Sequence, residues 1–115
     1  MVTRFELVLE QEKYTFRLRA NDGQVLLEGL ASPSKIVMQN EILHVRTAVR
    51  DKNKLVPHHD EDRHFVVVKD ADGSVLARSP RCATERDLSK LMAHLLATRS
   101  WAPIVDLTKR PAHAT

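Results

Sequence analysis

The densest group of side chains that could do chemistry lies between positions 58 and 64, in the run His-His-Asp-Glu-Asp-Arg-His. In an extended chain His58, Asp60, Asp62 and His64 would point to one side, as a zinc site needs. A metal site also needs fixed geometry, and this run has no cysteine, no second ligand cluster and an arginine inside it. We therefore interpret the run as a solvated turn between strands, and we predict that His58, His59, Asp60 and His64 hold no structural metal.

The one cysteine, Cys82, precedes a predicted helix start at Thr84 and has Arg81 and Arg86 close by. Cations and a helix N-terminus both lower the pKa of a thiol, so this pattern could give a reactive thiolate. No second cysteine is present to resolve it, and we favour a small, half-buried residue next to the cap. A single cysteine excludes an internal disulfide and is typical of a cytoplasmic protein.

Two histidines, His44 and His94, lie 50 residues apart, each inside a predicted helix beside apolar positions. Such a pair could meet and titrate near neutral pH, although a histidine at the edge of a helix face more often has no special role. The sequence shows no Ser-His-Asp order, no glycine-rich phosphate loop and no carboxylate pair. We predict no catalytic residue and no cofactor. A metal- or thiol-dependent activity at the histidine-rich turn or at Cys82 is the third of three functional hypotheses.

Basic residues suggest the second hypothesis, a nucleic-acid-binding accessory protein. The net charge is +3, and Arg17 and Arg19 project from the same side of a predicted strand. Sheets that bind single strands combine such residues with exposed aromatic rings, and here only Phe65 and Trp101 are predicted to be free for stacking. Further basic residues that could extend the surface are Arg4, Arg78, Arg81, Lys109 and Arg110.

The elements that position these residues are predicted to occur twice, because the two halves of the chain align without a gap after a shift of 50 residues. The Asp-Gly pair ending at Gly23 then falls on the pair ending at Gly73, and Ser34 falls on Thr84. Alternating residues and hairpin signals predict three strands in each half, followed by a helix that begins at the serine or threonine. We expect one domain over residues 1–115, with repeats at about 5–50 and 55–99 and a tail at 100–115.

This pattern resembles the YegP-like family, whose function is unknown. The residues that carry the resemblance are Tyr14-Thr15-Phe16-Arg17-Leu18, Asn21-Asp22-Gly23, Val25-Leu26-Leu27, Ser34 and Asn40-Glu41-Ile42-Leu43-His44-Val45. The family commonly carries two such units in tandem, which agrees with the 50-residue shift. The resemblance implies a fold and carries no catalytic residues.

The predicted fold is α+β: a tandem βββα repeat forming a mainly antiparallel sheet of five or six strands, with two helices packed on one face. The sheet should contribute to the core Phe5, Leu7, Tyr14, Phe16, Leu18, Val25, Leu27, Val66, Val68 and Val75. The helices should contribute Val37 or Met38, Ile42, Val45, Leu88, Leu91, Met92 and Leu95. The tail at residues 101–107 could add a short strand or an apolar clasp.

The opposite face of this sheet is predicted to be unusually apolar. Alternation sends to it Val8, Arg17, Arg19, Leu26, Phe65, Val67 and Leu76. A large open apolar patch usually marks an interaction site, so either the tail or a second copy of the chain should cover it. The first hypothesis is therefore a small, non-enzymatic binding or interaction module that forms a homodimer through these residues. No apolar run is long enough to span a membrane.

Overall fold

The computed structural model describes residues 3–98 and 102–108. The first half contains strands β1 (Arg4–Glu10), β2 (Lys13–Arg19) and β3 (Val25–Gly29), followed by helix α1 (Lys35–Ala48). After a short 3-10 helix (Lys52–Lys54) come β4 (Leu55–Asp60), β5 (Arg63–Lys69), β6 (Val75–Arg78), helix α2 (Glu85–Leu96) and β7 (Ile104–Asp106).

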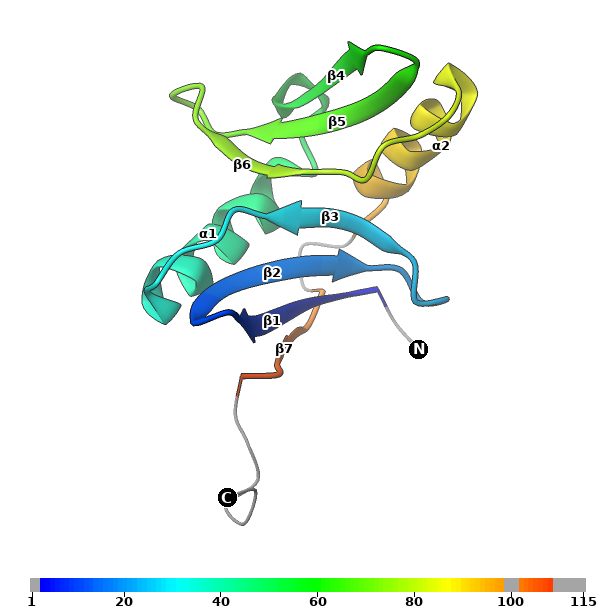
Figure 1. Cartoon of the computed structure of the whole chain (residues 1–115). Helices are drawn as coiled ribbons and strands as arrows, with labels where there is room; N and C mark the ends of the chain where they lie inside the picture. Colours follow the sequence, from blue (N-terminus) through cyan, green and yellow to red (C-terminus); the bar gives the residue numbers. More distant parts are fainter. Residues whose placement is uncertain (1–2, 99–101, 109–115) are drawn as a thin grey trace.

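The strands form one sheet in the order β4-β5-β6-β3-β2-β1-β7 (Figure 1). Six of them pair antiparallel, and β7 pairs parallel with the outer edge of β1. The mixed α+β class is confirmed, and the described residues form seven strands where five or six were predicted. The additional strand is the tail at Ile104–Asp106, so the tail extends the sheet sideways instead of covering its face.

Two kinds of turn join the strands within each half. Gln11 and Glu12 have φ values of 51° and 66°, as a two-residue primed hairpin requires. The turns at Gly23 and Gly73 are longer, with a positive φ of 91° and 88° at each glycine. Each is closed by a glycine N–H that donates to a carbonyl three residues earlier, at 2.9 and 3.0 Å. Each Asp-Gly pair thus lies in a three-residue hairpin loop whose last residue, the glycine, has a positive φ.

Each half contains one break in the alternation of its strands. Leu18 of β2 pairs with Leu27, but the next residue, Arg19, pairs with Val25, so Leu26 is an extra residue in β3. The same shift between β5 and β6 makes Leu76 an extra residue. These β-bulges place two residues of one strand opposite one residue of its neighbour.

The bulges overturn part of the predicted face assignment. Leu26 and Leu76 are only 1% and 4% exposed and belong to the core cluster that also contains the residues of both helices. Their neighbours Val25 and Val75, predicted to be core, are half-buried and exposed instead. A bulge resets the two-residue period, so the leucine turns inward and the valine outward.

The rest of the core prediction agrees well with the structure. Phe5, Leu7, Phe16, Leu18, Leu27, Val66, Val68, Met38, Ile42, Val45, Leu88, Leu91 and Leu95 are all buried in one cluster. Tyr14 and Met92 pack against it half-buried, and Val37 is exposed, so Met38 is the core residue of that pair. Because residues of α1 and α2 share this cluster with one face of the strands, both helices cover the same face, which lies behind the sheet in Figure 1.

Both helices begin where a hydroxyl side chain caps them. Ser34 Oγ accepts a hydrogen bond from the N–H of Val37 at 3.3 Å, and Thr84 Oγ1 accepts one from the N–H of Asp87 at 3.0 Å. None of the helices in the described part of the chain has the length and apolar character needed to cross a membrane.

A close contact between a glycine and a ring fixes the spacing of β2 and β3. A Cβ atom at Gly29 would lie 2.8 Å from Cζ of Phe16 and closer still to Cδ1 and Cε1. In the second half a 50-residue shift puts Ser79 and Val66 at these positions, and Ser79 Oγ accepts a hydrogen bond from the N–H of Val66 at 2.9 Å. The aromatic ring is thus accommodated by a glycine, and the smaller valine by a serine.

Candidate functional site

Strands β3 and β6 pair over a short length only, through Glu28 with Arg78 and Gly29 with Ala77. The segment that follows β6 then separates from β3. The chain then follows β5, where Cys82 and His64 exchange backbone hydrogen bonds of 2.9 and 2.6 Å. A groove of about 510 Å³ is lined by this segment, by the start of β3 and by residues of α2. These three elements lie next to one another in Figure 1.

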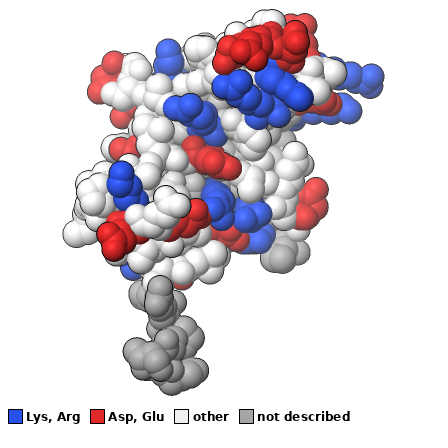
Figure 2. Space-filling model, viewed as in Figure 1, with Lys and Arg blue, Asp and Glu red and all other residues white. Residues whose placement is uncertain are grey.

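The groove combines three cationic side chains with apolar and small residues. Arg63, Arg81 and Lys90 line it together with His94, and Asp87 is the one carboxylate among its lining residues. Among residues 3–98 and 102–108, no acidic side chain pairs with Arg63 or Lys90. In Figure 2 basic side chains gather at the upper right, the side on which α2 lies in Figure 1.

Arg81 is held in place by neighbours on β4 and β5. Its guanidinium carbon lies 5.5 Å from the ring centre of Phe65, and Nη2 lies 3.2 Å from Oδ2 of Asp60. The Phe65 ring also stacks on His58, with 5.4 Å between ring centres. The side chains of Arg81 and Asp60 are more than half exposed, so water screens their ion pair and it contributes little energy. The contact with the Phe65 ring therefore orients the Arg81 side chain.

Cys82 also lines the groove, but its environment does not favour a thiolate. Burial and the nearby charge of Asp87 both raise the pKa of the thiol above its ordinary value. The thiol environment therefore contradicts the activation suggested by the neighbouring arginines and the helix start, since desolvation and a carboxylate act in the opposite direction.

We predict that Cys82 reacts slowly with a thiol reagent. Near neutral pH the native protein should be alkylated more slowly than the urea-unfolded chain, because the raised pKa leaves less thiolate. Replacing Asp87 by Asn should speed alkylation by removing one of the two causes, and mass spectrometry would follow both proteins. A native thiol that reacts faster than the unfolded one would contradict this assignment.

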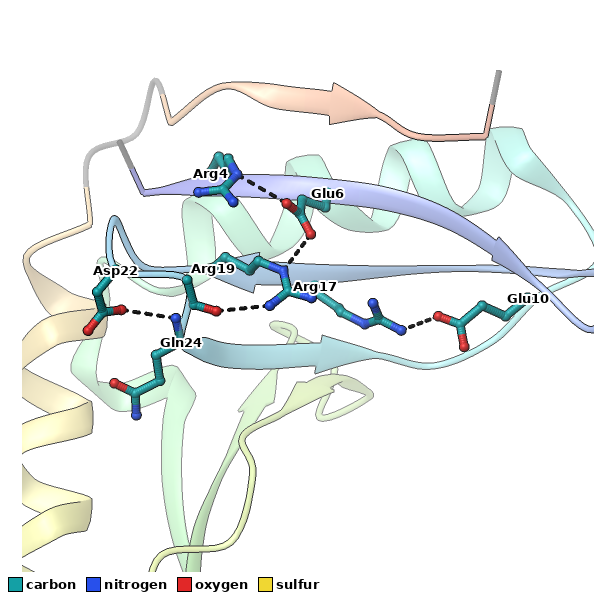
Figure 3. A network of polar contacts seen from close by, with 8 residues as sticks. Arg4, Glu6, Glu10, Arg17, Arg19, Asp22 and Gln24 are labelled. Carbon is teal, nitrogen blue, oxygen red and sulfur yellow. Dashed lines mark hydrogen bonds and ion pairs between the residues drawn. The ribbon is translucent and has the colours of Figure 1, made fainter. Parts of the chain in front are cut away.

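The face of the sheet away from the helices carries a network of ion pairs (Figure 3). Glu6 joins Arg19 at 2.6 Å and Arg4 at 3.1 Å, and Arg17 pairs with Glu10. Arg19 also donates to the carbonyl of Gly23 at 2.9 Å. Arg17 and Arg19, which were predicted to project from one side of the strand as a basic surface, are paired with carboxylates, and this weakens the case for nucleic-acid binding on this face.

The face that carries the ion-pair network is less apolar than the sequence predicted. Val8 and Val67 are 8% and 7% exposed although they lie outside the core cluster. The register places Arg17 opposite Glu28 and Glu28 opposite Arg78, so charged side chains cross the sheet in a row. With Leu26 and Leu76 in the core, the face is less apolar than simple alternation predicts.

Glu6 gives this network a predicted pH dependence. Burial alone would raise the pKa of Glu6, but the hydrogen bonds and charges of Arg19 and Arg4 outweigh it and hold the pKa below its ordinary value of 4.5. A carboxylate with a lowered folded pKa adds stability above its unfolded pKa and loses it as pH falls through the folded value.

The free energy of unfolding should therefore fall as the pH drops below about 4.5, and part of this fall should disappear in Glu6→Gln. Glu12→Gln, in an exposed turn, serves as the control and should leave the fall unchanged. Urea denaturation followed by circular dichroism at several pH values measures the difference. Equal pH curves for the native protein and Glu6→Gln would exclude this role of Glu6.

The histidine-rich run forms the end of the β4–β5 hairpin and does not gather its side chains at one point. His58 lies opposite Phe65, whereas His59 lies opposite His64 and stacks on it at 4.5 Å between ring centres. His64 is therefore on the side of His59 and not on that of His58, because the hairpin turn resets the alternation. No three histidine, cysteine or acidic side chains in the described ranges are close enough together to hold a metal ion.

The two helix histidines that lie 50 residues apart have different surroundings. His44 Nδ1 is 3.9 Å from Oδ2 of Asp70, and His94 lines the groove. Trp101, Lys109 and Arg110, which were predicted to contribute stacking or charge, lie outside the described residues.

Comparison with solved structures identifies the fold. The structure superposes on yegP from E. coli, a protein of unknown function, with a TM-score of 0.86 and 20% identity over 96% of this chain and 97% of that one. It superposes on the UPF0339 protein of Shewanella oneidensis with a TM-score of 0.88 and 20% identity over 100% and 99% of the two chains. No family model and no curated protein matches the sequence. The chain thus has the fold of YegP and its UPF0339 counterpart.

Proposed function

We propose that the chain is a non-enzymatic binding module of the YegP-like family whose groove takes an anionic ligand. The observation that carries this proposal is the groove itself, where Arg63, Arg81 and Lys90 face a single carboxylate, Asp87. Two of these cations have no acidic partner in the described part of the chain, so an anion would gain their charge without breaking an existing pair. Cys82, the one thiol there, has a raised pKa, which favours binding over nucleophilic chemistry.

We further propose that the two halves are a tandem repeat and that only the second half kept the ligand site. Two observations support the repeat: the glycine turns at 23 and 73, and the equivalent bridges Tyr14–Ser32 and His64–Cys82. A shift of 50 residues puts Ala31 at the position of Arg81 and Asn40 at that of Lys90. The first half therefore lacks two of the three cations.

Anion binding can be tested by nuclear magnetic resonance on the labelled full chain. Sulfate and malonate, each compared with chloride at equal ionic strength, should shift the amide signals of Ala83 and Lys90. Lys90→Ala should weaken both responses, whereas Lys13→Ala, at the position equivalent to Arg63 in the other half, should leave them unchanged. Signals that move equally at all basic residues would show screening by salt and would contradict a site.

Self-association remains a separate proposal. Of the residues predicted to form an interface, those that remain on the sheet face away from the helices follow from the strand registers. They are Val8, Arg17, Arg19, Phe65 and Val67. Sedimentation of Phe65→Asp should show a lower mass than the native chain if this face joins two copies, because Phe65 stays partly exposed whereas Val8 and Val67 are 8% and 7% exposed. Leu26→Asp should instead lower stability, because Leu26 is a core residue. A monomeric native protein at micromolar concentration would end the proposal.

A further inference from the structure

We infer that the ligand of the groove is a small phosphate monoester bound as its dianion, an inference that rests on the proposed function. Three cationic side chains and one carboxylate line the groove, and Asp60 pairs with Arg81 from outside the lining, which leaves Arg63 and Lys90 as the two cations without an acidic partner among the described residues. A phosphate monoester carries a charge of about −1.5 to −2 near neutral pH and offers three strong acceptor oxygens, so one such group can match both cations. A single carboxylate group would match only one of them.

Backbone geometry adds donors to the same wall. Cys82 uses its N–H and its carbonyl for the two bonds to His64, at 2.6 and 2.9 Å. In an antiparallel pair the groups of the adjacent residue point the other way, so the N–H of Arg81 is directed away from β5, on the side of the groove. A backbone N–H and a guanidinium of the same residue can donate to oxygens of one anion.

The first turn of α2 opens on the same wall, since Ala83 and Asp87 both line the groove. The hydroxyl oxygen of Thr84 accepts a hydrogen bond from the N–H of Asp87. The positive end of the α2 dipole lies at this end of the helix, which borders the groove. The helix end adds a favourable field for an anion held by the three cationic side chains and the N–H of Arg81.

The rest of the groove suits an organic group attached to the phosphate. Val25, Leu26, Pro80 and Leu91 form an apolar part of the lining, and Gln24 offers an amide. The volume of about 510 Å³ lies in the range of small-molecule sites and far exceeds one phosphate group. Inorganic phosphate alone would leave this apolar part in contact with water, so an ester should bind more tightly.

Titrations of the full chain with glycerol 3-phosphate, inorganic phosphate, sulfate and malonate test the inference. We expect the ester to bind most tightly and malonate most weakly, because malonate carries two separate carboxylates in place of three oxygens on one phosphorus atom. Arg63→Ala and Lys90→Ala should each weaken ester binding by about tenfold, or about 1.4 kcal/mol, with Lys13→Ala unchanged. The amide spectrum outside the groove checks that each variant folds.

A pH series separates phosphate recognition from general attraction of anions. Between about pH 5 and about pH 8 a phosphate ester gains its second charge, whereas sulfate keeps the same charge. Both ligands meet the same protein groups, so the ratio of their affinities should rise with pH for a site that selects the dianion. A constant ratio, or malonate binding as tightly as the ester, would overturn the phosphate inference while leaving an anion site in place. Absence of binding by all four probes would overturn the proposed function as well.

Discussion

Replacing Gly29 by alanine should destabilise the protein by about 1–3 kcal/mol, although only one methyl group is added. The added Cβ would overlap the Phe16 ring, which is fully buried and therefore has no room to move away. Gly29 lacks the left-handed φ found at Gly23 and Gly73, so a loss of stability would come from packing and not from backbone strain.

A double-mutant cycle separates this overlap from other effects of the substitution. Phe16→Val removes the ring and should itself cost stability, because it leaves a cavity. In that background Gly29→Ala should cost much less than it does beside Phe16, as the Val66–Ser79 pair suggests. Chemical denaturation gives the four free energies, and equal costs of Gly29→Ala in both backgrounds would show that the ring is not the cause.

Replacing Ile42 by alanine should cost about 2–5 kcal/mol. Ile42 is fully buried in the cluster that joins α1 to the sheet, so the substitution loses apolar burial and leaves a cavity. Ile36 lies on the same helix and is 70% exposed, which makes Ile36→Ala a control with the same chemistry. That control should stay within about 0.5 kcal/mol of the native protein.

The two isoleucine variants should be compared by urea denaturation at equal protein concentration. A cost of Ile42→Ala near zero would mean that α1 presents a different face to the sheet. Leu95→Ala tests α2 in the same way, because Leu95 is also fully buried and belongs to the same cluster.

Local patterns predicted most of this fold. The alternation at Tyr14, Phe16 and Leu18 and the helical spacing of Met38, Ile42 and Val45 depend only on near neighbours in sequence, and the structure confirms their facing. Capping by Ser34 and Thr84 is equally local. Such features are encoded within one or two turns of chain, so the sequence alone suffices to find them.

Features that depend on distant pairing were missed. The bulges at Leu26 and Leu76 have no sequence signal of their own, because a leucine fits either face of a strand. The groove exists only where β3 and the segment after β6 diverge, so sequence analysis could not join Lys90 to Arg63. The hints of asymmetry in the sequence were Ala31 and Asn40, which align with Arg81 and Lys90 after the shift of 50 residues.

The parallel pairing of β7 with β1 has a consequence for how the chain folds during synthesis. Phe5 pairs with Ile104, so the edge of β1 is completed by residues made about 100 positions later. Until they leave the ribosome, β1 presents an open strand edge, the kind of surface that recruits other chains. Lys35, at the start of α1, binds Asp106 at 2.8 Å and is in place before that strand arrives. The ion pair therefore gives β7 a docking point beside β1 and favours it over strands that lack an acidic residue at this position.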